Sequence, residues 1–175
     1  MQCSVFIATS VDGFVAGVGD DLGWLRVVER PGEDYGYEAF MGTVDVLVMG
    51  RRTYEVALGF PSWPYAGKRV VVMSRALGAG DVRHGVEVFG GSPGELVASL
   101  RAQGLERAYV DGAALIRSFL EAGLIDDLTL SVVPVVLGGG IRLFGDAGSR
   151  RDLVLEESRA FPSGLVRSRY RLARP

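Results

Sequence analysis

Short, continuously apolar runs rich in valine constrain the fold of this 175-residue chain more than any other feature. Continuous rather than alternating hydrophobicity is typical of strands that are covered on both faces, as in parallel and mixed sheets. The runs that predict such strands lie at residues 4–9, 45–49, 69–73, 107–110 and 128–137. A further candidate, only three residues long, lies at 87–89.

Segments of helix length separate these runs. The clearest helix start is Ser92-Pro93-Gly94-Glu95, which combines an N-cap serine, a proline at the first helical position and a capping-box glutamate. After residue 145, two runs at 152–161 and 165–172 flank Pro162-Ser163-Gly164 and predict an antiparallel hairpin. The expected helices cover residues 33–43, 53–58, 92–104 and 113–122.

The alternation of strands and helices predicts a fold class. We expect one α/β domain over residues 1–175, with three layers and a mostly parallel mixed sheet that ends in the antiparallel hairpin. With 48% hydrophobic and 23% charged residues, the composition is that of an ordinary globular domain.

Composition and charge exclude several classes of site. One cysteine cannot form an internal disulfide, and one histidine, His84, excludes a multi-histidine metal site, so we expect no metal. A net charge of −2 argues against nucleic-acid binding. The first residues lack the basic region of a signal peptide, and no run approaches the ~20 apolar residues of a membrane span. We therefore expect a cytoplasmic protein with no membrane partner.

Three junctions at the ends of predicted parallel strands contain residues that could bind a ligand. In open α/β sheets, ligands bind outside the carboxyl ends of the strands, where helix N-termini attract anions. The junctions are 50–53 (Gly-Arg-Arg-Thr), 74–75 (Ser-Arg) and 111–114 (Asp-Gly-Ala-Ala). Each one alone is a weak signal, because an arginine at the start of a helix is usually a solvated surface charge. Together they favour a ligand that carries phosphate, although the chain has neither a P-loop nor a G-x-S-x-G motif.

Around these junctions the sequence resembles the dihydrofolate reductase fold, and specifically the reductase domains of riboflavin biosynthesis and their stand-alone relatives. The resemblance implies a three-layer α/β/α fold, NADPH as cofactor and, by analogy, a homodimer. The segments that carry it are residues 8–14, 48–54, 71–75, 109–113, 122–127 and 134–140.

The resemblance also implies which residues bind ligands. A small-molecule substrate would contact Trp24 and Phe40, and the loop 17–20 would form a flap over the site. The residues implied in NADPH binding are Ala8, Val18, Gly19, Gly50, Arg51, Arg52, Thr53, Ser74, Arg75, Val110, Asp111, Gly112, Ala113, Ala114 and Leu115.

The sequence does not decide which of several residues is the acid that would supply a proton. The carboxylate expected before the second strand could be Glu33, Asp34 or Glu38, and spacing does not choose between them. Our catalytic candidates are Asp12, Glu38, Ser131 and Asp111.

Two functions follow from these observations. The first is an NADPH-dependent reductase that transfers a hydride to a C=N or C=O bond of a small heterocycle, similar to 5-amino-6-(5-phosphoribosylamino)uracil or to dihydrofolate and other pteridines. The alternative is a nucleotide-binding sensor or interaction module that keeps the cleft without efficient catalysis.

Overall fold

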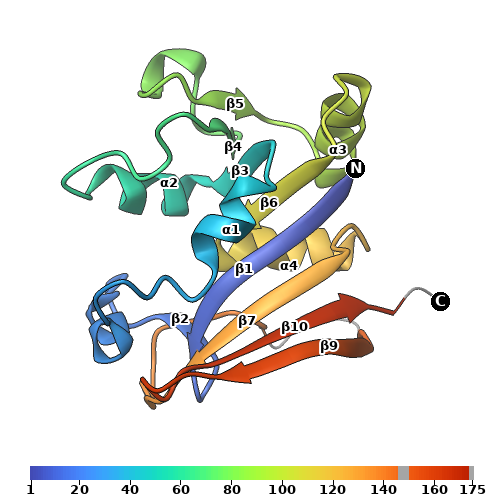
Figure 1. Ribbon diagram of the computed structural model, residues 1–175. Coiled ribbons are helices and arrows are strands. Elements are labelled where there is room, and N and C mark those ends of the chain that lie inside the picture. Colours follow the sequence, from blue (N-terminus) through green and yellow to red (C-terminus); the bar gives the residue numbers. More distant parts are fainter. Residues whose placement is uncertain (146–149, 174–175) are drawn as a thin grey trace.

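The computed structural model describes residues 1–145 and 150–173, and its central element is an eight-stranded mixed sheet (Figure 1). The strand order is β5-β4-β3-β6-β1-β7-β10-β9; the first six strands run parallel, and the last two form an antiparallel hairpin. The strands are β1 (Gln2–Ser10), β3 (Val46–Gly50), β4 (Arg69–Met73), β5 (Glu87–Phe89), β6 (Arg107–Asp111), β7 (Asp127–Val133), β9 (Leu153–Ala160) and β10 (Val166–Leu172). The predicted fold class is confirmed.

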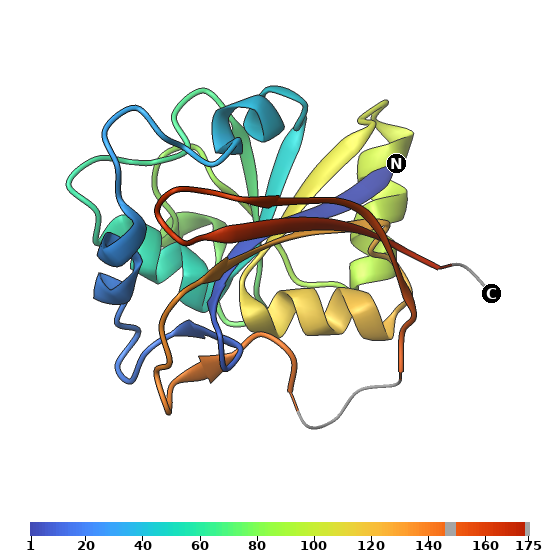
Figure 2. The same cartoon turned by 60° about the horizontal axis from the view of Figure 1, so that its bottom comes forward.

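Helices cover both faces of the sheet (Figure 2). Helices α3 (Pro93–Ala102) and α4 (Ala113–Glu121) pack on one face, whereas α1 (Tyr37–Gly42) and α2 (Arg51–Leu58) pack on the other. The alternation of side chains along β3 separates the two cores. None of the helices within the described ranges combines the length and the apolar character that a membrane crossing demands.

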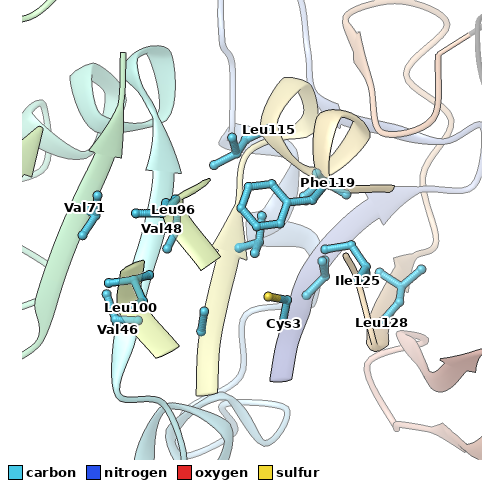
Figure 3. Close-up of a cluster of buried hydrophobic side chains, with 14 of the residues drawn as sticks. Cys3, Val46, Val48, Val71, Leu96, Leu100, Leu115, Phe119, Ile125 and Leu128 are labelled. Atoms are coloured by element: carbon cyan, nitrogen blue, oxygen red, sulfur yellow. The ribbon is translucent and has the colours of Figure 1, made fainter. Parts of the chain in front are cut away.

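The larger core lies between the sheet and helices α3 and α4 (Figure 3). Phe119 of α4 is fully buried there, beside Cys3 of β1 and Leu128 of β7. On α3, the predicted capping box is present: the Ser92 hydroxyl accepts the Glu95 amide at 3.3 Å, and the Glu95 carboxylate accepts the Ser92 amide at 2.7 Å. Capping fixes the start of α3, and burial fixes which face of each helix points inward.

Three predicted boundaries were wrong. The helix expected over 33–43 spans only Tyr37–Gly42, because Tyr35 and Gly36 adopt positive φ values of 58° and 84°. The strand expected to reach residue 137 ends at Val133, before a proline that cannot donate to the ladder. Helix α2 begins at Arg51 rather than Thr53, directly after the strand.

A small second sheet was not predicted. Strand β2 (Phe14–Ala16) pairs antiparallel with β8 (Ile141–Arg142), and both are too short to give a periodic sequence signal. Two 3-10 helices were also missed, η1 (Gly23–Val28) and η2 (Ala79–Asp81). The β2–β8 sheet brings the loop after β2 to the carboxyl ends of the parallel strands.

Candidate functional site

A cavity of about 640 Å³ opens at the carboxyl ends of β1, β3 and β6. This is the edge of a parallel sheet where ligands are expected to bind, and the volume lies in the range of ligand pockets. The sequence-predicted residues that line it are Ala8, Gly50, Arg51, Arg52, Thr53, Asp111, Gly112, Ala113, Ala114 and Leu115. Ala16 of β2 and Ile141 of β8 complete one wall.

The start of α2 gives the cavity its anion-binding character. Gly50 is the N-cap residue, and no side chain among the described residues caps the helix, so its first amide groups remain available to a ligand. The side chains of Arg51 and Arg52 are 53% and 64% exposed. Amides and guanidinium groups at one point form a site suited to phosphate oxygens.

Both arginines form ion pairs with carboxylates in this structure. Arg52 donates from Nε to Oδ1 of Asp20 at 2.7 Å and from Nη2 to Oδ2 at 2.8 Å. Arg51 donates to Glu55 at 2.8 Å, one turn along the helix. Asp20 belongs to the loop after β2, has a φ of 64° and lines the cavity. A phosphate that takes the Arg52 guanidinium therefore competes with Asp20.

We expect Asp20→Asn to tighten the binding of a ligand that carries phosphate about two- to fivefold, the range of an exposed ion pair. The amide removes the competing charge but keeps the shape of the side chain. Calorimetry at low salt measures the change. Asp152→Asn is the control, because it removes one charge from an exposed pair with Arg150. Unchanged or weaker binding in Asp20→Asn alone would contradict the competition.

A close approach between α2 and the β6–α4 turn shapes the middle of the cavity. Gly112 has a φ of 96°, and a Cβ at this position would collide with the Thr53 hydroxyl. Glycine avoids both the strain and the collision. The first turns of α2 and α4 therefore lie together at the cavity wall.

Asp111 is a half-buried carboxylate that lines the cavity. Burial raises its pKa to about 6, although the Gly112 amide, which donates to Oδ1 at 2.8 Å, and the hydroxyls of Tyr109 and Tyr65 favour the ionised form. Burial also raises the pKa of the Tyr65 hydroxyl. A carboxyl that titrates near neutrality can hold and release a proton under physiological conditions.

A second cavity of about 300 Å³ shares a wall with the first. Phe6, Ile7 and Ala8 of β1, together with Leu25 of η1, line both cavities. Ser131 of β7, which is paired with Ala8 across the sheet, lines only the second. The arrangement suits two ligands that meet at Ala8.

Asp34 is the carboxylate that the structure places at the second cavity. Its oxygens accept the amides of Gly36 at 2.9 Å and Glu38 at 2.7 Å, and these bonds lower its pKa. Glu38 is exposed on α1, and Glu33 accepts the Tyr35 amide. Neither of them lines a cavity described here.

Asp12 stabilises a loop through hydrogen bonds and lines neither of the two cavities. It accepts the amides of Leu137 at 3.1 Å and Gly138 at 2.7 Å, and hydrogen bonds, first among them one with the Ser10 hydroxyl, lower its pKa to about 2. Asp12 thereby fastens the turn after β1 to the segment before β8.

The remaining candidates lie around the cavities rather than in their walls. Trp24 is buried in a third apolar cluster with Val28, and Phe40 packs against Phe6 with ring centroids 5.1 Å apart. Val110 is fully buried in the core. The others outside the cavity walls are Val18 and Gly19 in the loop after β2, and Ser74 and Arg75 at the end of β4.

Sequence reasoning missed several cavity residues. Tyr65 lies in the irregular segment between α2 and β4, where no motif marks it. Phe6 and Leu25 carry only the signal of an apolar side chain. Asp20 had a signal, since it ends the predicted flap, but its partner Arg52 could be identified only from the fold.

The sequence and the fold are similar to those of known proteins. The chain matches the family model of the RibD C-terminal domain over residues 3–167. A solved protein from Shewanella sp. PV-4, which its name assigns provisionally to riboflavin biosynthesis, is 37% identical with a TM-score of 0.93, and the match covers 99% of this chain and 100% of that one.

Two further relatives extend the comparison. Uncharacterized protein YwjB of Bacillus subtilis (strain 168) is 32% identical over 158 residues, which is 90% of each chain. A pyrimidine reductase-like protein from Corynebacterium diphtheriae NCTC shares the fold, with 19% identity, a TM-score of 0.69 and coverage of 99% of this chain and 92% of that one.

Proposed function

The chain belongs to the family of RibD C-terminal domains, and on that premise we propose that it is an NADPH-dependent reductase of a small heterocycle. The reaction is transfer of a hydride to a C=N or C=O bond. The observation that carries the proposal is the start of α2, where uncapped amides and two arginines line a cavity that also contains the titratable carboxyl of Asp111.

The residues of the larger cavity fit this cofactor. The amides that follow Gly50 and the guanidinium groups of Arg51 and Arg52 would hold phosphates, and the turn at Gly112 has no side chain that would block a ligand. Ser74 and Arg75 would contact the 2′-phosphate from the end of β4. NADPH would supply the hydride, so the protein itself needs neither a nucleophile nor a metal.

The chain must position the substrate and supply a proton. Ala8 has a small side chain at the wall that both cavities share, so two bound rings can come together there. Asp111 would provide the proton, because its raised pKa keeps part of the population protonated near neutral pH. Asp34 would accept rather than donate, since hydrogen bonds from two backbone amides keep it ionised.

The pH dependence of turnover tests the role of Asp111. A carboxyl that donates a proton is active only in its protonated form, so we expect the rate of hydride transfer to fall as pH rises through about 6. Tyr65→Phe removes a hydroxyl that favours the ionised form, so it should raise the pKa and move this limb to higher pH. Single-turnover rates across pH measure both effects. A limb that persists unchanged in Asp111→Asn would exclude Asp111 as its source.

Calorimetry with NADPH and NADH tests the cofactor. We expect NADPH to bind more tightly than NADH, and Arg52→Gln to weaken NADPH binding about tenfold through loss of charge-assisted hydrogen bonds. Arg69→Gln is the matched control, because Arg69 also forms a two-point pair with a carboxylate, Glu87, at the start of β4. If neither dinucleotide binds, the cofactor proposal fails.

A nucleotide-binding sensor or interaction module is the second candidate function, and the ionised state of Asp34 favours it. The carboxylate nearest the second cavity is held ionised and is a poor proton donor. A protein that binds NADPH but oxidises it with none of the candidate heterocycles would be such a module.

We also propose that the protein is a homodimer through strand β9. Every residue of this edge strand is exposed, and Leu153, Val154 and Leu155 are 42%, 42% and 55% exposed. Exposed apolar edge strands favour pairing with another chain. We expect sedimentation equilibrium to give a dimer mass and Leu155→Arg to give a monomer; a monomeric parent protein would contradict the proposal.

A further inference from the structure

Tyr35 and Gly36 form an unusual backbone pair in the segment that contributes to the wall of the second cavity. Tyr35 has a φ of 58°, a left-handed conformation that is costly for a bulky side chain, and Gly36 follows with a φ of 84°. Asp34, Tyr35 and Tyr37 all line the cavity. The conformation of the pair therefore determines where the side chains of Asp34 and Tyr37 lie. A strained conformation of this kind persists only where neighbouring groups hold it.

Arg167 of β10 holds the pair through its guanidinium group. Nη1 donates to the Tyr35 carbonyl at 2.7 Å, and Nη2 donates to the Glu157 carboxylate of β9 at 2.9 Å. The Arg167 side chain is 17% exposed, whereas that of Arg169, two residues along the strand, is 50% exposed and pairs with Glu156 at 3.3 Å. A guanidinium that is bonded at both ends and shielded from water is a firm support for the carbonyl.

Gly36 makes room for this guanidinium. A Cβ at Gly36 would collide with Nη1 of Arg167. Glycine therefore serves both the positive φ and the approach of Arg167 to the preceding carbonyl. Gly32, in the same segment between η1 and α1, also has a positive φ, 77°, but a Cβ there would meet nothing within 4 Å. The requirement for space is thus specific to Gly36.

The Tyr35 side chain attaches the same segment to the turn of the hairpin. Its hydroxyl donates to the Val28 carbonyl and lies 2.9 Å from the Ser163 hydroxyl. Its ring packs edge-on against Phe161, with ring centroids 4.9 Å apart. The hairpin therefore supports this part of the cavity wall at two points, the Tyr35 side chain and the Tyr35 carbonyl.

The backbone that Arg167 supports in turn holds the Asp34 carboxylate. The amides of Glu38 and Gly36 donate to Asp34 at 2.7 and 2.9 Å, and these bonds, together with the charge of Arg167, lower its pKa. Both amides follow Tyr35 in the chain, so a rotation of Tyr35 out of the left-handed region would move them away from the carboxylate. Arg167 itself lines neither of the two cavities described above.

We infer that Arg167 is a positioning residue: from β10 it fixes the left-handed Tyr35-Gly36 pair and thereby places Asp34 and Tyr37 in the wall of the second cavity. The inference rests on the proposed function, in which two bound rings meet at the wall that the cavities share. Arg167 touches neither ring, and its effect on binding passes through the segment that it holds.

Amide hydrogen exchange, followed by NMR on the full chain, tests the inference. In Arg167→Gln we expect the amides of Gly36 and Glu38 to exchange about tenfold faster, because the loss of a charge-assisted hydrogen bond lets the pair open more often. In Arg169→Gln, which removes a charge from the same strand, both amides should exchange as in the parent protein. Equal exchange in Arg167→Gln and the parent would overturn the inference.

Gly36→Ala tests the same contact with the charge of Arg167 still present. The methyl group would displace the guanidinium from the Tyr35 carbonyl, so the pKa of Asp34 should rise toward its ordinary value. Gly32→Ala is the control for backbone strain and should leave the pKa of Asp34 unchanged. NMR titration of the Asp34 carboxyl carbon measures both. The same Asp34 pKa in the two variants would contradict the positioning role, even if Arg167→Gln failed to fold.

Ligand binding keeps the inference distinct from the proposed function. The compound 5-amino-6-(5-phosphoribosylamino)uracil or dihydrofolate, titrated into protein saturated with NADP⁺, should bind about tenfold more weakly to Arg167→Gln than to the parent, with NADPH affinity unchanged. Faster amide exchange with an unchanged ligand affinity would make Arg167 merely structural and overturn the inference. A parent protein that binds neither compound, or no NADPH, would contradict the proposed function, while amide exchange would still decide whether Arg167 positions the wall.

Discussion

Gly140→Ala is expected to lower the free energy of unfolding by about 2–6 kcal/mol. Gly140 has a φ of 130°, a conformation that side chains rarely adopt. A Cβ there would also collide with the carbonyl oxygen of Ala16 and with the backbone of Gly17. Both obstacles are backbone atoms, so no change of rotamer relieves them. Urea unfolding of the two proteins measures the difference.

Gly139→Ala is the matched control for this prediction. A Cβ at Gly139 meets only the Val18 side chain, at 3.9 Å, so the change should alter stability by about 0.5 kcal/mol or less. Because Gly140 packs against the strand that leads into the Asp20 loop, Gly140→Ala should also weaken NADPH binding. Equal stability of the two variants would contradict the packing described here.

Gly112→Ala is expected to weaken NADPH binding about tenfold or more and to cost about 1–3 kcal/mol of stability. The new methyl group would push against the Thr53 hydroxyl and separate the first turns of α2 and α4, which line the cavity together. The combination of Thr53→Ala with Gly112→Ala should recover part of the stability, because it removes the nearest atom. Calorimetry and urea unfolding report the two effects.

Gly104→Ala is the control for Gly112→Ala, because it introduces backbone strain without a collision between the new Cβ and a neighbouring atom. Gly104 also has a positive φ, 80°, but a Cβ there meets nothing within 4 Å. We expect it to cost about 1 kcal/mol and to leave NADPH affinity unchanged. If Gly112→Ala behaved no differently from Gly104→Ala, the close approach to Thr53 would have no part in binding.

The sheet was predictable because its parallel strands are buried on both faces. Such strands carry an unbroken apolar signal, and β3 and β4 show it over almost their whole length. Element boundaries were less predictable where a local backbone conformation overrides propensity. The left-handed pair Tyr35-Gly36 shortens α1, and nothing in these residue types alone requires that conformation.

Of the candidate site, only the two strand–helix junctions could be predicted from the sequence. The junctions at Gly50 and Gly112 follow from strand–helix order, so the sequence identified that part of the cavity. Tyr65 and the Asp20–Arg52 pair depend on contacts between distant segments and have no local signal. The raised pKa of Asp111 likewise comes from burial, which spacing in the chain does not reveal.

The structure also changes how the candidate acids are ranked. Asp12 accepts backbone amides of the segment before β8, Glu38 is exposed on α1, and neither side chain lines a cavity described here. Asp111 and Ser131 line the two cavities that meet at Ala8. These two side chains therefore remain our candidates for contact with the reacting ring.

A crystal structure of the protein soaked with NADPH tests the central claim most directly. We predict phosphates at the amides of Gly50–Thr53, with Arg52 released from Asp20, and the nicotinamide against Ala8 beside the second cavity. Dinucleotide bound away from the carboxyl ends of β1, β3 and β6, or a cavity that stays empty at saturating NADPH while Asp20 still holds Arg52, would contradict the account.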